Sequence, residues 1–214
     1  MYLIYAEIRY VAIWVYFRLN PGHQYHIAES HLVGFSFFNT LQLHFCSLIH
    51  FVSAMTMLGK TDGASAADGS SYLELISFIK SNGANPKRDL TELWKRIVFS
   101  MAVSNTDDHM RNHGFILRGD GWHLSPLYDV NPVPEGNELS LCVNEDDATI
   151  SLDLAFEIAP YCGISAKDAS AIAAEILKIV RENWNRLATE CGLSRNAQEY
   201  MRPAFSLVLE QGDS

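Results

Sequence analysis

The sequence predicts a mainly α-helical fold with a small β-element. Apolar residues recur at helical spacing in residues 75–79, 93–101 and 172–187, and this spacing gives each stretch one apolar face. Residues 114–124 instead have the pattern of two short strands joined by a Gly-Asp-Gly turn. The chain has 214 residues, of which 48% are hydrophobic and 19% charged. It can therefore bury a core of ordinary size.

The first of these helices follows a loop of small residues at 63–70. Ser71 and Glu74 have the spacing of a capping box, in which the two side chains satisfy backbone N–H groups at the start of a helix. The apolar positions of 75–79 then form the buried face, and Gly83 ends the helix.

The second helix is expected to begin near Asp89 or Thr91 and to continue through Met101. Upstream of both helices, residues 51–58 form an apolar stretch, which we interpret as a short helix or buried segment that ends at Gly59. The second helix leads directly into a polar segment that carries the most informative residues of the chain.

The C-terminal half continues the helical pattern. Residues 139–143 are predicted as a third short strand, and helices are predicted over 152–161 and 166–188. Gly163 separates these two helices, and a last helix is expected to pass Gln198. The small sheet should therefore lie beside the polar segment, with helices around it.

Charge and cysteine content restrict the function classes. The net charge is −9 and the pI is about 5.3, and such an acidic chain is a poor match for the phosphate backbone. We therefore expect no direct nucleic-acid contact. The four cysteines are scattered and form no C-x-x-C pair, which indicates reduced thiols in a cytoplasmic protein. Residues 31–59 contain no Lys, Arg, Asp or Glu, but polar residues dilute them, so we expect no membrane span.

The chain divides into two parts by composition. Residues 1–47 are aromatic, nearly free of acidic residues and without lysine, and we treat them as a segment of unknown fold. Residues 48–214 form the second part, in which the helical and strand signals are clear. We expect that the gene product is truncated or frameshifted, with an unrelated leader before the second part.

Three polar residues in the second part have the spacing of a phosphoryl-transfer site. Asp107 and Asn112 are separated by four residues, as in the catalytic loop of protein kinases. Asp129 follows a hairpin, and a hairpin returns its second end beside its first. Carboxylate and amide oxygens are the ligands that Mg²⁺ requires. Asp108 is a rival for the base, but only Asp107 gives the four-residue gap to Asn112.

The sequence around these residues resembles the HipA family, the toxin kinases of bacterial toxin–antitoxin pairs. The resemblance rests on N-T-D-D-H-M-R-N-H-G-F-I-L at 105–117 and W-H-L-S-P-L-Y-D-V at 122–130. The segment I-H-F-V-S-A-M-T-M-L-G at 49–59 is also similar. The resemblance implies a protein-kinase-like C-terminal lobe over 48–214.

The resemblance also implies roles for individual residues. It makes Asp107 the catalytic base and Asn112 and Asp129 the ligands of magnesium, through which they hold Mg-ATP. His109 and Tyr128 would support the loop. The implied reaction transfers the γ-phosphate of ATP to a serine or threonine of a protein. The implied role is the toxin of a type II toxin–antitoxin pair, and the implied partner is a helix-turn-helix antitoxin.

Two other functions remain open from the residues alone. Residues 1–59 contain no lysine and no G-x-G element, whereas a kinase N-terminal lobe supplies both. One alternative is therefore an incomplete kinase remnant that binds an antitoxin or an N-lobe subunit. Gly59-Lys60-Thr61 does not replace these elements, because the glycine that a P-loop requires five residues earlier is Ala54.

A lesser alternative is a metal-dependent hydrolase. His109 and His113 are four residues apart, which is a spacing used by metal ligands on helices. Further ligands for such a site would come from four side chains nearby in the sequence: Asp107, Asp108, His123 and Asp129.

Overall fold

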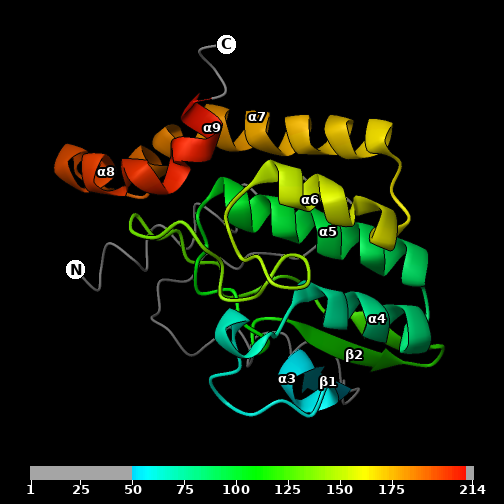
Figure 1. The fold of residues 1–214 in the computed structure, drawn as a ribbon. Helices are drawn as coiled ribbons and strands as arrows, with labels where there is room; N and C mark the ends of the chain where they lie inside the picture. The colour runs from blue at the N-terminus through cyan, green and yellow to red at the C-terminus, as the bar shows by residue number, and fades with distance from the viewer. Residues whose placement is uncertain (1–49, 211–214) are drawn as a thin grey trace.

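The computed structural model describes residues 50–210 and is mostly helical, with one three-stranded antiparallel sheet (Figure 1). This confirms the predicted fold class. The elements in chain order are β1 (His50–Ser53), α3 (Ala54–Met57), η1 (Ala66–Asp68), α4 (Tyr72–Asn82), α5 (Pro86–Ala102), β2 (Gly114–Arg118), β3 (Gly121–Leu124), α6 (Leu152–Ile158), η2 (Ala159–Cys162), α7 (Ala166–Glu190), α8 (Arg195–Met201), η3 (Arg202–Phe205) and α9 (Ser206–Glu210).

Helix α5 is the central element of the fold. Figure 1 shows it between α4 with the sheet on one side and α6 with α7 on the other, and it contacts α4, α6 and α7. Most of its second half is buried, and the indole of Trp94 donates a hydrogen bond of 2.7 Å to the carbonyl of Ala155. Because its C-terminal end is fixed by this packing, the loop that follows α5 starts from a rigid base.

The capping signals account for the predicted helices. Ser71 and Glu74 form the expected capping box of α4, and Ser165 caps α7 by accepting a hydrogen bond from the backbone N–H of Asp168. Helix α5 begins earlier than predicted, at Pro86, after the cap residue Asn85. Proline suits the first turn of a helix, where its missing N–H would have no partner.

The sheet differs from the prediction in its third strand. The predicted hairpin forms β2 and β3, but the third strand is β1, which overlaps the start of the stretch 51–58. The rest of that stretch contains the short helix α3, as predicted. Within residues 139–143 only one isolated bridge forms, between Cys142 and Ser71. The backbone of this stretch bonds instead to its own turn, from Leu139 N to Ala148 O at 2.7 Å, and to the loop before α4.

Strand β1 joins the sheet directly to the polar segment. It pairs antiparallel with β2, and the N–H of Ala54 at its end donates to the carbonyl of His113 at 2.8 Å. A Cβ on Gly114 would lie 2.3 Å from the ring of Phe51. Only glycine therefore leaves room for the Phe51 ring in this position at the start of β2.

Two sequence predictions concern membrane spans and cysteines. In residues 50–210, no helix is both long and apolar enough to cross a membrane. The cysteines at 142, 162 and 191 are free thiols, while the remaining cysteine and the whole segment 1–47 lie outside the described residues. The separate fold of 1–47 stays a prediction.

Candidate functional site

The loop that carries Asp107, here called the Asp107 loop (residues 103–113), begins with a sharp turn. Ser104 adopts a left-handed backbone conformation with φ +47°, which is uncommon for a residue with a side chain. The buried amide of Asn105 then bonds in two directions. Its Nδ2 donates to Ser100 Oγ at 3.3 Å, and its Oδ1 accepts from the N–H of Asn131 at 2.9 Å. Asn105 thereby connects α5 to the segment that contains Asp129.

Asp107 presents its carboxylate to solvent. Its side chain is 62% exposed, and Nε2 of His109 lies 3.7 Å from its Oδ1. The Nδ1 atom of His109 is buried and has no hydrogen-bond partner among the described residues. An exposed carboxylate with one imidazole beside it can accept the proton of an incoming hydroxyl.

Asn112 has the opposite environment. It is 3% exposed, and its Nδ2 donates to the backbone carbonyl of Asp107 at 2.9 Å. This bond uses the nitrogen of the amide and fixes its orientation, so the oxygen Oδ1 is the atom that can face a cation. The donor set of an amide oxygen and the Asp129 carboxylate suits Mg²⁺, which takes oxygen ligands.

Asp129 is held beside the Asp107 loop from both sides. Its neighbour Tyr128 donates a hydrogen bond of 2.5 Å to the carbonyl of Arg111, and Asn131 is bonded to Asn105 as described above. Asp129 itself has φ +57°, and its Oδ1 accepts from Asn131 Nδ2 at 3.3 Å. Left-handed conformations of non-glycine residues cost about 1–3 kcal/mol and gather at functional sites.

Tyr128, which we expect to support the loop, also contacts strand β1. Its ring packs edge-on against Phe51, with the centroids 6.0 Å apart. Burial raises the pKa of the Tyr128 phenol well above its ordinary value. The phenol therefore stays protonated, so it can donate to Arg111.

A buried polar cluster, here called the Asp108 cluster, lies beneath the loop and consists of Tyr72, Ser100, Asp108 and His113. Tyr72 and Ser100 donate to Asp108 Oδ2 at 2.6 and 3.3 Å, and His113 Nε2 lies 3.1 Å from Oδ1. Burial alone would raise the pKa of Asp108, but His113 and the hydrogen bonds outweigh it and lower the pKa. Burial and the Asp108 charge raise the pKa of Tyr72 well above its ordinary value. Asp108 is thus a buried structural carboxylate, and the rival interpretation as the base loses its support.

The ligands of the hydrolase alternative are not brought together. His113 belongs to the buried Asp108 cluster, whereas His123 on β3 lies 2.8 Å from Asp120 and 3.0 Å from Arg88. Across the described part of the chain, no group of three or more His, Cys, Asp or Glu is placed to hold a metal ion.

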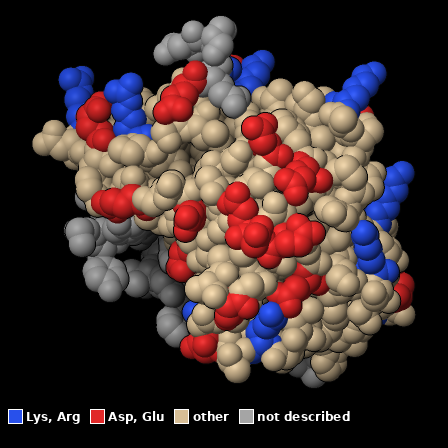
Figure 2. All heavy atoms as spheres, viewed as in Figure 1, with Lys and Arg blue, Asp and Glu red and all other residues tan. Residues whose placement is uncertain are grey.

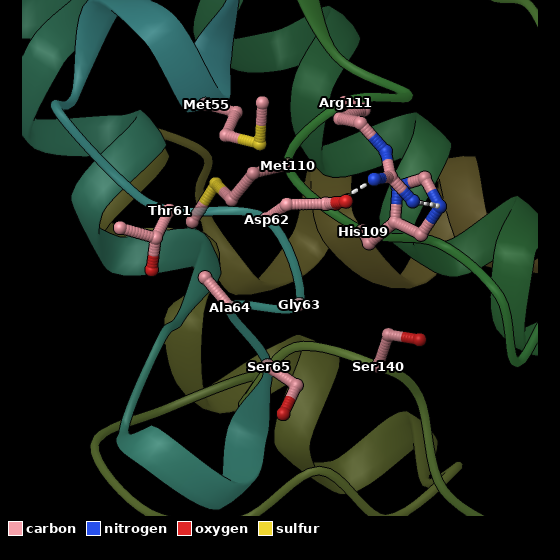
Figure 3. A pocket seen from close by; sticks show the side chains of 10 residues that line it. All are labelled: Met55, Thr61, Asp62, Gly63, Ala64, Ser65, His109, Met110, Arg111 and Ser140. Carbon is pink, nitrogen blue, oxygen red and sulfur yellow. Dashed lines mark hydrogen bonds and ion pairs between the residues drawn. The ribbon is translucent and has the colours of Figure 1, made fainter.

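A small pocket of about 150 Å³ lies against the Asp107 loop (Figure 3). Figure 3 shows Arg111 and Asp62 pointing toward one another across its rim, where they form an ion pair, with His109 beside Arg111. Lys60, from the sequence that mimics a P-loop, instead pairs with Glu74 at 2.8 Å. That lysine therefore stabilises the start of α4 and is not directed at this site.

Comparisons with known proteins identify the family of the chain. The family model for the HipA-like C-terminal domain matches residues 29–184. The chain belongs to this HipA-like family. A putative kinase of Haemophilus influenzae is 33% identical over 69 residues, which cover 30% of this chain and 20% of that protein. The family match begins at residue 29, upstream of the division that we place after residue 47.

A solved structure shows the same fold. It is described as the Shewanella oneidensis MR-1 toxin–antitoxin system of HipA, HipB and its operator DNA, and the matched chain superposes with a TM-score of 0.63 at 15% identity. The match covers 76% of this chain and 42% of that chain, so our chain spans less than half of either relative. Because that complex contains DNA, our expectation of no direct nucleic-acid contact is not borne out.

The sequence missed two members of the site. Tyr72 and Ser100 lie on helix faces whose apolar pattern predicts an ordinary hydrophobic core. No residue near either one in the sequence indicates a hydrogen bond to Asp108. The sequence predicts His113 as a loop residue that satisfies hydrogen bonds or, in the hydrolase alternative, as a metal ligand. The structure buries it fully beside Asp108.

Proposed function

We propose that this chain is the catalytic lobe of a cytoplasmic HipA-like serine/threonine protein kinase. In this proposal Asp107 accepts the proton of the substrate hydroxyl, and Asn112 and Asp129 hold magnesium and thereby the phosphates of ATP. When bound, magnesium neutralises charge on the transferring phosphate.

One observation carries the proposal. The bonds of Tyr128 to Arg111 and of Asn131 to Asn105 bracket Asp129 and hold it against the loop that contains Asp107 and Asn112. Phosphoryl transfer depends on position and charge more than on covalent chemistry. A carboxylate fixed beside an exposed base and an oriented amide meets that requirement.

The chemistry assigned to each side chain follows from its environment. The exposed carboxylate of Asp107 can be reached by a protein hydroxyl, and His109 at 3.7 Å limits its orientations. Asn112 is buried and its amide is fixed, so it can act as a ligand without rearrangement. Asp129 supplies the negative charge that a divalent cation needs.

We also propose that the protein is the toxin of a type II toxin–antitoxin pair and binds a helix-turn-helix antitoxin. The support is the family and the Shewanella structure, in which a HipA chain is in complex with HipB and operator DNA. Co-purification of the chain with the product of a neighbouring small gene would test this part. Failure to co-purify from a co-expressing cell would count against it.

The proposed kinase activity is tested by measuring the transfer of label from γ-labelled ATP to the proteins of a cell extract. We expect transfer by the unmodified chain, loss with Asp107→Asn, and full transfer with Asp146→Asn, an exposed carboxylate remote in sequence from the loop. Equal transfer by Asp107→Asn and the unmodified chain would refute the assignment of the base. Transfer by none of the three, with intact antitoxin binding, would favour the alternative of a non-catalytic binding module.

A further inference from the structure

A groove of about 790 Å³ lies between the N-terminal half of α5 and the β2–β3 hairpin. Its volume is within the range of ligand pockets. No role in the proposed phosphoryl transfer accounts for it. Its charged lining consists of Lys87, Arg88, Asp89, Glu92, Lys95, Arg96, Arg118 and Asp120, together with His123.

The groove is cationic in an acidic protein. Five of the 16 Lys and Arg residues of the chain line it, against three of the 25 Asp and Glu residues. Figure 2, by contrast, shows acidic side chains gathered over the middle of the face that it presents. A local surplus of two positive charges (five minus three) on a chain of net charge −9 attracts anionic segments of a partner.

Each carboxylate of the groove already has a cationic or imidazole partner. Asp89 lies 2.8 Å from Arg88, and Glu92 lies 2.9 Å from Arg96. The third, Asp120, lies 2.8 Å from His123. None of the three carboxylates forms an ion pair with Lys87, Lys95 or Arg118, although the Arg118 charge adds to the effect of His123 in lowering the pKa of Asp120.

The remaining cations are Lys87, Lys95 and Arg118. None of the three forms an ion pair with a described residue, and Lys87 and Arg118 are exposed. They come from two different elements, α5 and β2, which face each other across the groove. An extended ligand with acidic groups at intervals would meet all three.

Internal hydrogen bonds hold the floor of the groove in place. Asp89 and Arg96 are each 2% exposed. Asp89 accepts a hydrogen bond from the N–H of Leu124 at 3.1 Å, and Arg96 donates to the carbonyl of Ser125 at 2.7 Å. These bonds fix β3 and the residue that follows it, Ser125, against α5, so the groove needs no rearrangement to accept a ligand.

We infer that this groove binds an extended, acidic segment of a protein partner. A peptide fits better than a nucleic acid because the lining includes three carboxylates. A continuous phosphate backbone would meet repulsion from them, whereas a peptide places acidic side chains and N–H groups alternately along its length. The lining of the groove includes Pro126, which precedes Asp129 by three residues in the chain.

Binding is tested with the full chain and a fluorescent peptide of alternating glutamate and serine, measured by fluorescence anisotropy. We expect saturable binding that weakens as salt rises. We expect roughly tenfold weaker binding with the triple variant Lys87→Ala, Lys95→Ala and Arg118→Ala. A peptide of alternating glutamine and serine should not bind. Hydrogen exchange should slow at 85–96 and 116–126 on binding.

The matched control removes the same charges elsewhere. Lys167→Ala, Lys178→Ala and Arg195→Ala lie on exposed positions of α7 and α8, and this triple variant should bind the peptide as the unmodified chain does. Equal losses in both triple variants would mean that only net charge matters and would overturn the inference. Tighter, groove-dependent binding of duplex DNA than of the peptide would also overturn it. None of these readouts requires phosphoryl transfer, so they are independent of the proposed kinase.

Discussion

Replacing Asp108 by alanine removes the only carboxylate of the Asp108 cluster. The substitution leaves the hydroxyls of Tyr72 and Ser100 without their shared acceptor and the imidazole of His113 without its ion-pair partner. Both Tyr72 and His113 are fully buried, so water does not replace the lost bonds.

The size of the stability loss in Asp108→Ala follows from the burial of all the side chains that contact Asp108. Removing one member of a buried ion pair costs about 3–5 kcal/mol, and short hydrogen bonds to a charged group are worth about 1.5–3 kcal/mol each. Because these terms overlap, we expect a loss of about 3–5 kcal/mol from the free energy of unfolding. For a chain of this size that lowers Tm by about 6–20 °C. Asp108→Asn keeps the shape of the side chain and should lose less.

The assay is urea unfolding followed by circular dichroism, with Asp146→Ala as the exposed control. The control should change the free energy of unfolding by about 0.5 kcal/mol or less. If Asp108→Ala cost less than about 1 kcal/mol with an unchanged m-value, the cluster would not stabilise the loop and the reasoning would be refuted. A double-mutant cycle of Asp108→Asn with Tyr72→Phe should give a coupling energy of at least about 0.5 kcal/mol.

Three further predictions concern the same region. The pKa of Asp108 in the folded protein lies below its ordinary value of 3.8. Its contribution to the free energy of unfolding is therefore present above about pH 4 and is lost as pH falls through the folded pKa. Unfolding measured between about pH 6 and about pH 3 should show less acid sensitivity in Asp108→Asn than in the unmodified chain. Gly114→Ala places a methyl group against Phe51 and should cost about 1–3 kcal/mol, whereas Gly119→Ala, which meets open space, should be nearly neutral by the same urea titration. Tyr128→Phe removes one hydrogen bond that positions Asp129; it should cost about 1 kcal/mol of stability and weaken Mg-ATP binding, and unchanged affinity would show that the bond does not position Asp129.

Local signals were sufficient for most of the fold. The capping box at Ser71 and Glu74, the cap at Ser165 and the Gly-Asp-Gly turn each predict an element from a few adjacent residues, and each element forms. The spacing of Asp107 and Asn112 likewise selected one loop, while the catalytic roles of these residues stay predictions.

Features that depend on distant partners were not predictable. Strand β1 exists because Phe51 pairs with Ile116, far along the chain, and its own four residues resemble any apolar stretch. The apolar character of Leu141 predicts a strand, but the residue is buried without a ladder partner. The hydrogen bond from Tyr72 to Asp108 joins residues 36 positions apart, and the sequence around either residue does not predict it.

The central claim is that Asn112 and Asp129 hold Mg-ATP beside Asp107, and calorimetric titration of Mg-ATP into the purified chain tests it most directly. The account predicts binding by the unmodified chain and by Asp107→Asn, and loss of binding with Asp129→Ala, which should remain folded by circular dichroism. Binding of equal affinity by Asp129→Ala and the unmodified chain would contradict the account.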